Sequence, residues 1–390
     1  MKVLLIHRYF WPEEISTLPV MLRDLVNLHA EREDDVVVVT GNRNGYLEVW
    51  NNEFAENVQI NCFTADLDRN SSYAMRIWNM CRLLVLAIRS IYSVKPDLIY
   101  TVTYPPGLAS ALILATRLIS RKTRVVFYVQ DILTYRISNI VLRFVYVKLF
   151  AYACRTSHRV ITLTDDMREE IYSMVGITSG VSNTVLDDKV CVIPNYSPDL
   201  YTSDFRNEKK QFDIIYAGNH GEAQNLDHFL RVLARLPKSK PPVVVFFGEG
   251  THKRRLVELA EELDVAVQFN PSVSRSEVSE RISVSAFGLV GAVPDLMRYA
   301  FPSKLAAYNA VGVPGIVMCN SESGTADWLS EMGVGTCLDP VDITVAAKQL
   351  ETALESKSHY DSVVVHRTAQ KIYSLDAYRH TFTKEILDSL

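Results

Sequence analysis

A lysine at the start of a predicted helix is the side chain in this sequence best suited to hold a phosphate. The segment 301–305 (Phe-Pro-Ser-Lys-Leu) opens an apolar, helix-compatible run that ends at Gly312, and a β-branched strand follows Pro314. Lys304 therefore falls in the first helical turn, where unpaired backbone N–H groups and the helix dipole already favour an anion. A diphosphate fits this position, and a solvated surface lysine is the alternative. Ser303 is a candidate helix cap or phosphate ligand.

A glycine-rich turn is the second candidate for phosphate contact. Residues 218–221 (Gly-Asn-His-Gly) follow an apolar strand candidate and precede a helix that begins near Asn225. Glycines at such a turn let backbone N–H groups approach phosphate oxygens, because no Cβ stands in the way. Taken alone, the pattern is more often an ordinary tight turn.

A carboxylate follows an apolar strand in the first half of the chain. Gln130 and Asp131 come directly after the strand candidate 125–129. A carboxylate at the carboxyl end of a parallel strand faces the ligand crevice, where it could orient or deprotonate an acceptor hydroxyl as a general base. The alternative is that Asp131 caps the next helix.

These residues are carried by a chain long enough for two domains. The sequence has 390 residues, 48% of them hydrophobic and 22% charged, which is typical of a globular protein. Its six cysteines show no C-x-x-C spacing, which disfavours a zinc site or a disulfide framework and fits a reducing compartment. The first residues predict a buried strand and not a signal peptide, and no uncharged apolar stretch is long enough to predict a membrane span.

The net charge of −4 conceals a strongly basic segment. Between Tyr73 and Arg159 the sequence holds thirteen Lys or Arg and two Asp, which gives 13 − 2 = +11. Such an excess indicates an anionic partner, and its bulky apolar residues favour an anionic membrane surface over core-facing helices with a solvated basic side. Nucleic acid is not expected, because the segment carries no recognised binding motif.

Short apolar strands alternate with amphipathic helices along the whole chain, which predicts parallel sheets covered on both faces. The alternation occurs twice, with a break near residues 191–211. We therefore expect two Rossmann-like doubly wound α/β domains facing a cleft. The expected boundaries are residues 1–197 for an acceptor-binding domain, 198–365 for a nucleotide-sugar-binding domain, and 366–390 for a helix that returns to the first domain. Strands are expected at 2–7, 36–40, 98–102, 124–129, 159–163, 212–217, 242–247, 266–269, 286–290 and 315–318.

Five short motifs occur in the order typical of one enzyme family, at residues 9–14, 192–195, 216–224, 247–250 and 301–305. Together they resemble GT-B glycosyltransferases of the GT4 type, in the branch that builds bacterial O-antigen and capsule and includes N-acetyl-fucosaminyl transferase-like proteins. One departure is clear. Where those enzymes carry the glutamate that holds the nucleotide ribose, this chain has Ala307.

The resemblance implies roles for particular residues. It assigns the donor diphosphate to Lys304, which also counts as catalytic with Asp131, and to Gly218, Asn219, Gly221, Gln224, Arg298 and Ser303. It assigns the nucleoside to Gly248, Glu249 and Gly250, and Asp327 and Glu322 are candidate substitutes for the missing ribose acceptor. It places Glu13, Glu14, Gln130 and Asp131 on the acceptor side.

The resemblance also implies a reaction. A retaining, metal-independent transferase without a cofactor would move a sugar from a nucleoside diphosphate, most often UDP, to a polyprenyl-diphosphate-linked saccharide. It would work in the cytoplasm, peripherally on the inner face of the plasma membrane. Two alternatives stay open: a non-catalytic relative that acts as an assembly partner, which Ala307 motivates, and a UDP-sugar epimerase.

Overall fold

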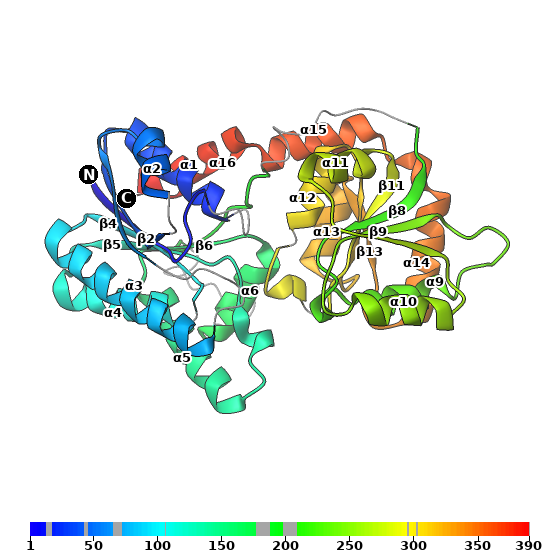
Figure 1. The fold of residues 1–390 in the computed structure, drawn as a ribbon, viewed down its shortest axis with the longest axis horizontal. Coiled ribbons are helices and arrows are strands. Elements are labelled where there is room, and N and C mark those ends of the chain that lie inside the picture. The colour runs from blue at the N-terminus through cyan, green and yellow to red at the C-terminus, as the bar shows by residue number, and fades with distance from the viewer. Residues whose placement is uncertain are drawn as a thin grey trace. The chain divides into compact units, whose positions relative to one another are not determined.

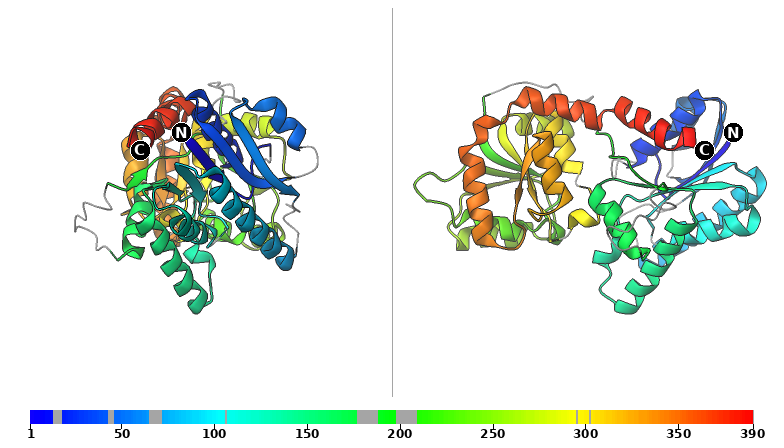
Figure 2. Two further views of the ribbon diagram at one scale, coloured as in Figure 1. Left: turned by 90° about the vertical axis from the view of Figure 1, so that its left-hand side faces the viewer. Right: turned by 180° about the vertical axis from the view of Figure 1, so that it is seen from behind.

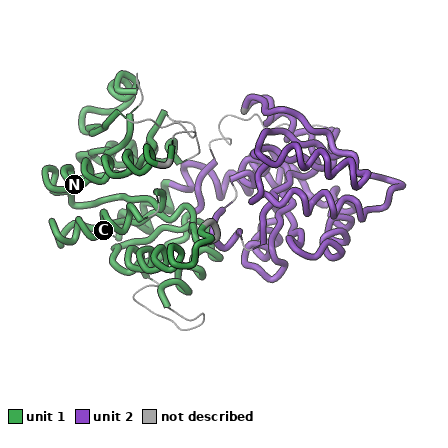
Figure 3. Tube along the Cα trace, turned by 60° about the horizontal axis from the view of Figure 1, so that its bottom comes forward, with its two compact units in different colours: residues 1–193, 379–390 green, residues 194–378 purple. Residues whose placement is uncertain are grey.

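The chain forms two compact units, which Figure 3 shows in separate colours. The structure, a computed structural model, describes residues 1–12, 18–42, 46–64, 72–105, 107–176, 188–197, 209–294, 296–301 and 303–389. Unit 1 consists of Met1–Ile193 together with Arg379–Leu390, and unit 2 consists of Pro194–Tyr378.

Unit 1 is built on a parallel sheet whose strand order, over the described residues, is β3-β2-β1-β4-β5-β6-β7. The order reverses between β1 and β4, and doubly wound sheets bind ligands beyond the carboxyl ends of the strands at such a point. Every residue of β4 is buried, as a strand covered by helices on both faces requires. The strands are β1 (Lys2–Ile6), β2 (Asp35–Asn42), β3 (Val58–Thr64), β4 (Leu98–Val102), β5 (Arg124–Tyr128), β6 (Arg159–Thr162) and β7 (Val190–Val192).

The helices of unit 1 lie on both faces of this sheet. Figure 1 shows α1 and α2 on one side and α3, α4 and α5 next to one another on the other. Side-chain oxygens begin several of them: Ser72 accepts from the backbone of α3, Asn139 from that of α5 and Thr164 from that of α6. The helices are α1 (Leu18–Glu31), α2 (Tyr46–Glu53), α3 (Tyr73–Val94), α4 (Leu108–Ile119), α5 (Ile140–Thr156) and α6 (Asp165–Met174), with a 3₁₀ turn η1 (Leu133–Arg136).

The last turns of the chain complete the core of unit 1. Most of α16 (Leu375–Glu385) and the 3₁₀ turn η5 (Leu387–Ser389) belong to this unit. Phe382 is fully buried with its ring centroid 6.0 Å from that of Tyr100, and Arg379 donates two hydrogen bonds, of 3.0 and 3.1 Å, to the carboxylate of Glu31. Both views of Figure 2 show the two ends of the chain close to each other.

Unit 2 repeats the same topology. Over the described residues its parallel sheet has the order β10-β9-β8-β11-β12-β13, which reverses between β8 and β11. Helices α9, α10 and α14 pack on one face, and α11, α12 and α15 on the other (Figure 1). The strands are β8 (Phe212–Ala217), β9 (Val244–Phe247), β10 (Val267–Asn270), β11 (Ser285–Val290), β12 (Gly315–Met318) and β13 (Gly335–Leu338). The helices are α9 (Leu226–Leu233), α10 (Lys253–Glu262), α11 (Arg275–Ser283), α12 (Ser303–Ala310), α13 (Gly324–Met332), α14 (Ile343–Glu355) and α15 (Ser362–Tyr373), with 3₁₀ turns η2 (Glu222–Gln224), η3 (Leu296–Arg298) and η4 (Lys357–His359).

The boundaries of the two units differ from the domain boundaries expected from the sequence. The first boundary lies at Ile193/Pro194 instead of 197/198, and residues 366–378 belong to unit 2 instead of a returning helix. The second difference has a packing cause. Ala369 and Tyr373 of α15 are fully buried against Ala306 of α12, together with Phe301 and Trp328, so α15 is part of the core of unit 2.

One helix departs from the expectation about membrane spans. Among the described residues, Ala74–Val94 of α3 is long and apolar enough by length and composition to cross a bilayer, despite its three arginines. In the structure, however, α3 covers β2 and β3, and its Leu83, Ala87 and Ile91 are fully buried. This is the arrangement of a helix that packs on a sheet, and the exposed side of α3 carries both apolar side chains and arginines.

Candidate active site

The strongest site candidate lies at the carboxyl edge of the unit 2 sheet, where the strand order reverses. The chain leaves β8 at Ala217 and β11 at Val290, and the two following loops are in contact, because Val293 N–H donates to the carbonyl of Ala223 at 3.0 Å. Helix α12 begins at the same edge with Ser303 and Lys304. The topology thus brings together the two segments that the sequence indicated for phosphate contact.

Lys304 lies directly over the first of these loops. A Cβ on Gly218 would come within 2.4 Å of Lys304 Cε and 3.1 Å of its Nζ, so the absence of a side chain at Gly218 makes room for the lysine. The ammonium group sits 5.3 Å from the ring centroid of Tyr216. Among the described residues no carboxylate lies within ion-pair distance of Lys304. Desolvation by the surrounding protein lowers the pKa of Lys304 to about 8. A partly desolvated cation without a protein counter-ion is poised for an anionic ligand.

Three backbone N–H groups of the glycine turn form hydrogen bonds within the protein, whereas the sequence hypothesis assigned such groups to phosphate oxygens. Gly218 N–H donates to the carbonyl of Phe247 and His220 N–H to that of Glu249, each at 2.9 Å, and Gly221 N–H donates to Gln224 Oε1 at 3.1 Å. These three N–H groups therefore hold the turn in place and are not free to bind phosphate. The predicted residues still shape the site, but Lys304 and the amino end of α12 supply its positive charge.

The loop after β9 packs against this turn so closely that only glycine fits. Gly248 has φ +140°, and a Cβ there would lie 1.9 Å from the carbonyl oxygen of Gly218. Lys253 fixes the same loop, because its ammonium donates to the carbonyls of Gly248 at 2.9 Å and Asn270 at 3.0 Å and to Glu249 Oε1 at 2.7 Å. The loops after β8 and β9 and the end of β10 are thus joined by hydrogen bonds next to Lys304.

His220 packs in the protein interior next to these loops. It is fully buried, and its ring lies 5.5 to 6.5 Å from those of Tyr216, Phe246 and Phe269. Burial lowers the pKa of His220, and the neighbouring Lys253 lowers it further. A neutral imidazole packed among aromatic rings is a structural residue here, although the sequence singled out only the turn around it.

Tyr308 is a residue of the site that sequence reasoning missed. Its hydroxyl donates to the carbonyl of Leu289 at 3.1 Å and accepts from the N–H of Ala217 at 3.2 Å, so it joins α12 to β8 and β11. Burial raises the pKa of this tyrosine, which remains neutral. The signal was present in the sequence, because Tyr308 follows Lys304 by four residues and shares its helix face.

The other predicted donor-side residues of unit 2 differ in exposure. Asn219 is exposed and its side chain donates to Gln224 Oε1 at 3.4 Å. Arg298 is exposed on η3, and Asp327 is exposed in the first turn of α13. Ala307 is half-buried on α12.

In unit 1, Asp131 is half-buried just beyond the carboxyl end of β5. The alternative that it caps the next helix does not hold, because η1 is preceded by Ile132 and α5 is capped by Asn139. Gln130 N–H donates to Thr103 Oγ1 at 3.1 Å, which anchors this loop to the end of β4. Glu13 and Glu14 lie outside the described residues.

Two further features of the described residues concern ligands. No group of three or more His, Cys, Asp or Glu side chains within the described ranges is arranged to hold a metal ion.

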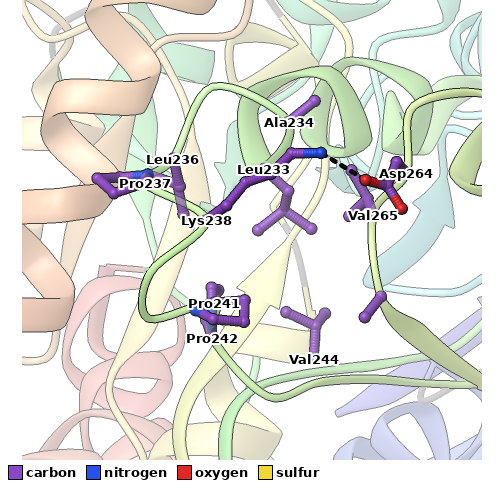
Figure 4. Close-up of a pocket in the computed structure, with 11 residues that line it drawn as sticks. Leu233, Ala234, Leu236, Pro237, Lys238, Pro241, Pro242, Val244, Asp264 and Val265 are labelled. Atoms are coloured by element: carbon purple, nitrogen blue, oxygen red, sulfur yellow. Dashed lines mark hydrogen bonds and ion pairs between the residues drawn. The ribbon is translucent and has the colours of Figure 1, made fainter.

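A pocket lies at the amino-terminal edge of the unit 2 sheet, where the ion pair between Lys238 and Asp264 closes one side (Figure 4). It is lined by residues that precede β9 and β10, so it lies at the edge opposite Lys304.

Replacing Gly218 with alanine is expected to lower kcat/KM by at least about tenfold, because the new Cβ collides with Lys304 and the φ of +144° is strained for alanine. Steady-state kinetics in a double-mutant cycle with Lys304→Ala checks the cause. If the lysine transmits the effect, Gly218→Ala costs much less activity in the Lys304→Ala background. Equal losses in both backgrounds would contradict this coupling.

Comparisons with known proteins identify the family of the chain. Residues 19–196 match the family model described as Glycosyltransferase Family 4, and residues 201–366 match the one described as Glycosyl transferases group 1. Over 175 residues the chain is 23% identical to WcaI of Escherichia coli (strain K12), which is described as a colanic acid biosynthesis glycosyl transferase. That match covers 44% of this chain and 42% of the relative.

Solved structures match the whole chain in fold. Sucrose-phosphate synthase from Thermosynechococcus elongatus superimposes with a TM-score of 0.72 at 12% identity, covering 99% of this chain and 98% of that one. The lipopolysaccharide outer core galactosyltransferase WaaB gives 0.68 at 14% identity, and Anabaena HepE in complex with UDP gives 0.65 at 16%, each covering 100% of both chains. The predicted fold and enzyme class are confirmed: the chain belongs to the glycosyltransferases of the GT-B fold, with a Glycosyltransferase Family 4 domain followed by a group 1 domain.

Proposed function

We propose that this glycosyltransferase moves a sugar from a nucleoside diphosphate, with UDP as the expected nucleotide, to a lipid-linked saccharide in the synthesis of a bacterial surface polysaccharide. The observation that carries the proposal is the partly desolvated Lys304, held over Gly218 at the reversal point of the unit 2 sheet. The description of WcaI supports polysaccharide synthesis, and the HepE structures with UDP and UDP-glucose support the donor class.

In this proposal Lys304 stabilises the leaving diphosphate. The bond between the anomeric carbon and the diphosphate oxygen breaks, negative charge develops on that oxygen, and a new bond forms to the acceptor hydroxyl oxygen. In the proposal, the donor diphosphate binds at the ammonium group and the amino end of α12, because preorganised positive charge in a partly desolvated site is effective for such a step. The reaction we propose is retaining and uses no metal or cofactor.

Asp131 is the proposed general base for the acceptor hydroxyl. Asp131→Asn preserves the shape of the side chain and removes its basicity, so kcat is expected to fall by about 10² or more while the melting temperature stays near that of the wild type. Steady-state kinetics with saturating donor checks this, with donor affinity from calorimetry as the control. A variant with unchanged kcat would remove Asp131 from the mechanism.

Two measurements test the function as a whole. Isothermal titration with UDP should show binding to the wild type and strongly reduced binding to Lys304→Ala. Incubation with labelled UDP-sugars and a lipid-extracted acceptor, with and without EDTA, should then give a labelled lipid product at equal rates. Absence of binding for any nucleoside diphosphate at millimolar concentration would favour the non-catalytic alternative. A changed sugar without an acceptor product would favour the epimerase.

A lipid-linked acceptor also implies a place of work. We propose that the protein acts in the cytoplasm, peripherally on the inner face of the plasma membrane, and that its basic segment between Tyr73 and Arg159 faces anionic lipid. The net charge of +11 over that segment supports this proposal.

A further inference from the structure

The first two turns of α5 are apolar and exposed on all sides. Residues 140–145 (Ile-Val-Leu-Arg-Phe-Val) are all exposed, and the five apolar ones are between 46% and 80% accessible. Six consecutive helical residues turn through more than a full circle, so exposed side chains surround the helix here. The helix is held from Tyr146 onward, where Tyr146, Phe150 and Cys154 form a buried stripe. We call residues 140–145 the α5 tip.

The neighbouring helices continue this apolar surface. On α3, Trp78, Val85 and Tyr92 follow one another at intervals of seven residues and are 61%, 50% and 71% exposed. A spacing of seven places them in one line along the helix. On α4, Leu114 and Leu118 are one turn apart and are also exposed. Helix α4 contacts both α3 and α5, so the three exposed faces adjoin.

Positive charge is interleaved with these apolar side chains. Within the bounds of α3, α4 and α5 the sequence has seven Arg or Lys and no Asp or Glu. Arg89 falls between Val85 and Tyr92 on the exposed line of α3, and Lys148 lies with its ammonium 5.3 Å from the ring centroid of Phe144 beside the α5 tip. Long basic side chains among apolar ones are suited to a boundary between headgroups and acyl chains.

From these observations we infer that the exposed faces of α3, α4 and α5 form one docking surface for an anionic phospholipid bilayer, and that the α5 tip enters the boundary between headgroups and acyl chains. Trp78 and Tyr92 lie at headgroup depth, and the arginines and lysines pair with lipid phosphates.

A second copy of this chain fits the surface less well. A two-fold interface would bring the same patch of each subunit together, and its exposed basic side chains, with no Asp or Glu within the three helices, would repel each other. An anionic bilayer instead complements both the charge and the apolar area. The inference deepens the proposed function, since it names the surface that would bring the enzyme to a lipid-linked acceptor, but it is tested without donor or acceptor.

Vesicle binding of the full-length protein tests the inference. Co-sedimentation with phosphatidylcholine vesicles that contain phosphatidylglycerol should show binding that weakens as salt rises, and vesicles of phosphatidylcholine alone should bind much less. Ile140→Ser with Phe144→Ser should lower the apparent affinity at least about tenfold, because two inserted side chains are lost. Both positions are exposed, so folding should be unaffected, which circular dichroism verifies.

A matched variant and a spectroscopic signal locate the surface. Val341→Ser with Val364→Ser removes two exposed apolar side chains from unit 2 and should leave vesicle binding unchanged. Tryptophan emission should shift to the blue on binding in the wild type and not in Trp78→Phe. The inference is overturned if vesicles do not bind, if the Ile140/Phe144 variant binds as the wild type does, or if sedimentation shows a dimer that this variant dissolves. Because no sugar transfer is measured, an inactive protein that binds vesicles would refute the proposed function and leave this inference standing.

Discussion

Replacing Lys304 with alanine is expected to lower kcat by about 10² or more and to leave the fold intact. The side chain lies over Gly218, and among the described residues it has no carboxylate partner, so its removal breaks no ion pair of the protein. What is lost, in the proposed mechanism, is the positive charge that stabilises the leaving diphosphate. Single-turnover kinetics with a UDP-sugar measures the effect, and near-normal turnover would refute the site assignment.

Because the pKa of Lys304 is lowered to about 8, donor binding through this side chain should depend on pH. Burial lowers this pKa to about 8, so the free protein loses the ammonium charge as the pH rises through that value. A bound diphosphate favours the charged form, so affinity for UDP should be flat from pH 7 to 8 and fall by up to about tenfold per unit above it. Lys304→Arg is the control, because the guanidinium stays charged and its affinity should show no such decline.

Stability should respond in the opposite direction. An unfolded lysine has a pKa of 10.5 and the folded one a pKa of about 8, so the unfolded state binds more protons between these values. Stability of the free protein contributed by this group therefore rises with pH across that window, and below it the buried charge is a constant cost. Lys304→Met should accordingly lose activity while its melting temperature at pH 7 equals or exceeds that of the wild type. A lower melting temperature would indicate a structural lysine.

Removing the C-terminal segment should have the second large effect. Deletion of the residues after Asp376, or the single change Phe382→Ala, is expected to destabilise unit 1 by about 3–5 kcal/mol through loss of a fully buried ring. In a unit of this size such a loss lowers the melting temperature by roughly 10 °C. Activity should fall with it, because the core beneath β4 is opened.

The contacts of this segment explain the size of the effect. Phe382 packs on Tyr100, whose hydroxyl lies 2.9 Å from His29 Nε2, and His29 Nδ1 lies 2.7 Å from Asp34. The amino-terminal ammonium donates to the same carboxylate at 2.7 Å. Differential scanning calorimetry measures the loss, with the exposed Lys384→Ala on the same helix as the matched control. A truncated protein with wild-type activity and melting temperature would show that the segment is dispensable.

The elements that the sequence predicted best are those whose residues are uniformly apolar or clearly periodic. The expected strand 98–102 has the observed bounds. Three strands were missed, β3 (Val58–Thr64), β7 (Val190–Val192) and β13 (Gly335–Leu338). They are short or lie at the edges of the sheets and contain half-exposed polar residues, so neither alternation nor a buried apolar run marks them.

The candidate site could be predicted from the sequence where the position of a residue in a helix decides its chemistry. It could not be predicted where two loops contact each other. Lys304 at the start of a helix could be identified from neighbouring residues alone. The bonds from Gly218 and His220 to the loop after β9 depend on packing between neighbouring strands, which no local pattern encodes. For this reason the glycine turn resembled a phosphate loop in the sequence, although the N–H groups of Gly218, His220 and Gly221 bond within the protein.

The discontinuous composition of unit 1 has a consequence for its biosynthesis. Its first part ends at Ile193, and its last segment begins at Arg379, so the whole of unit 2 leaves the ribosome in between. At typical translation speeds these 378 − 193 = 185 residues take roughly ten to forty seconds. During that interval Tyr100 lacks the ring of Phe382, whereas unit 2 is continuous and can fold as soon as it emerges. The core of the nascent first unit therefore stays incomplete until the last segment is synthesised.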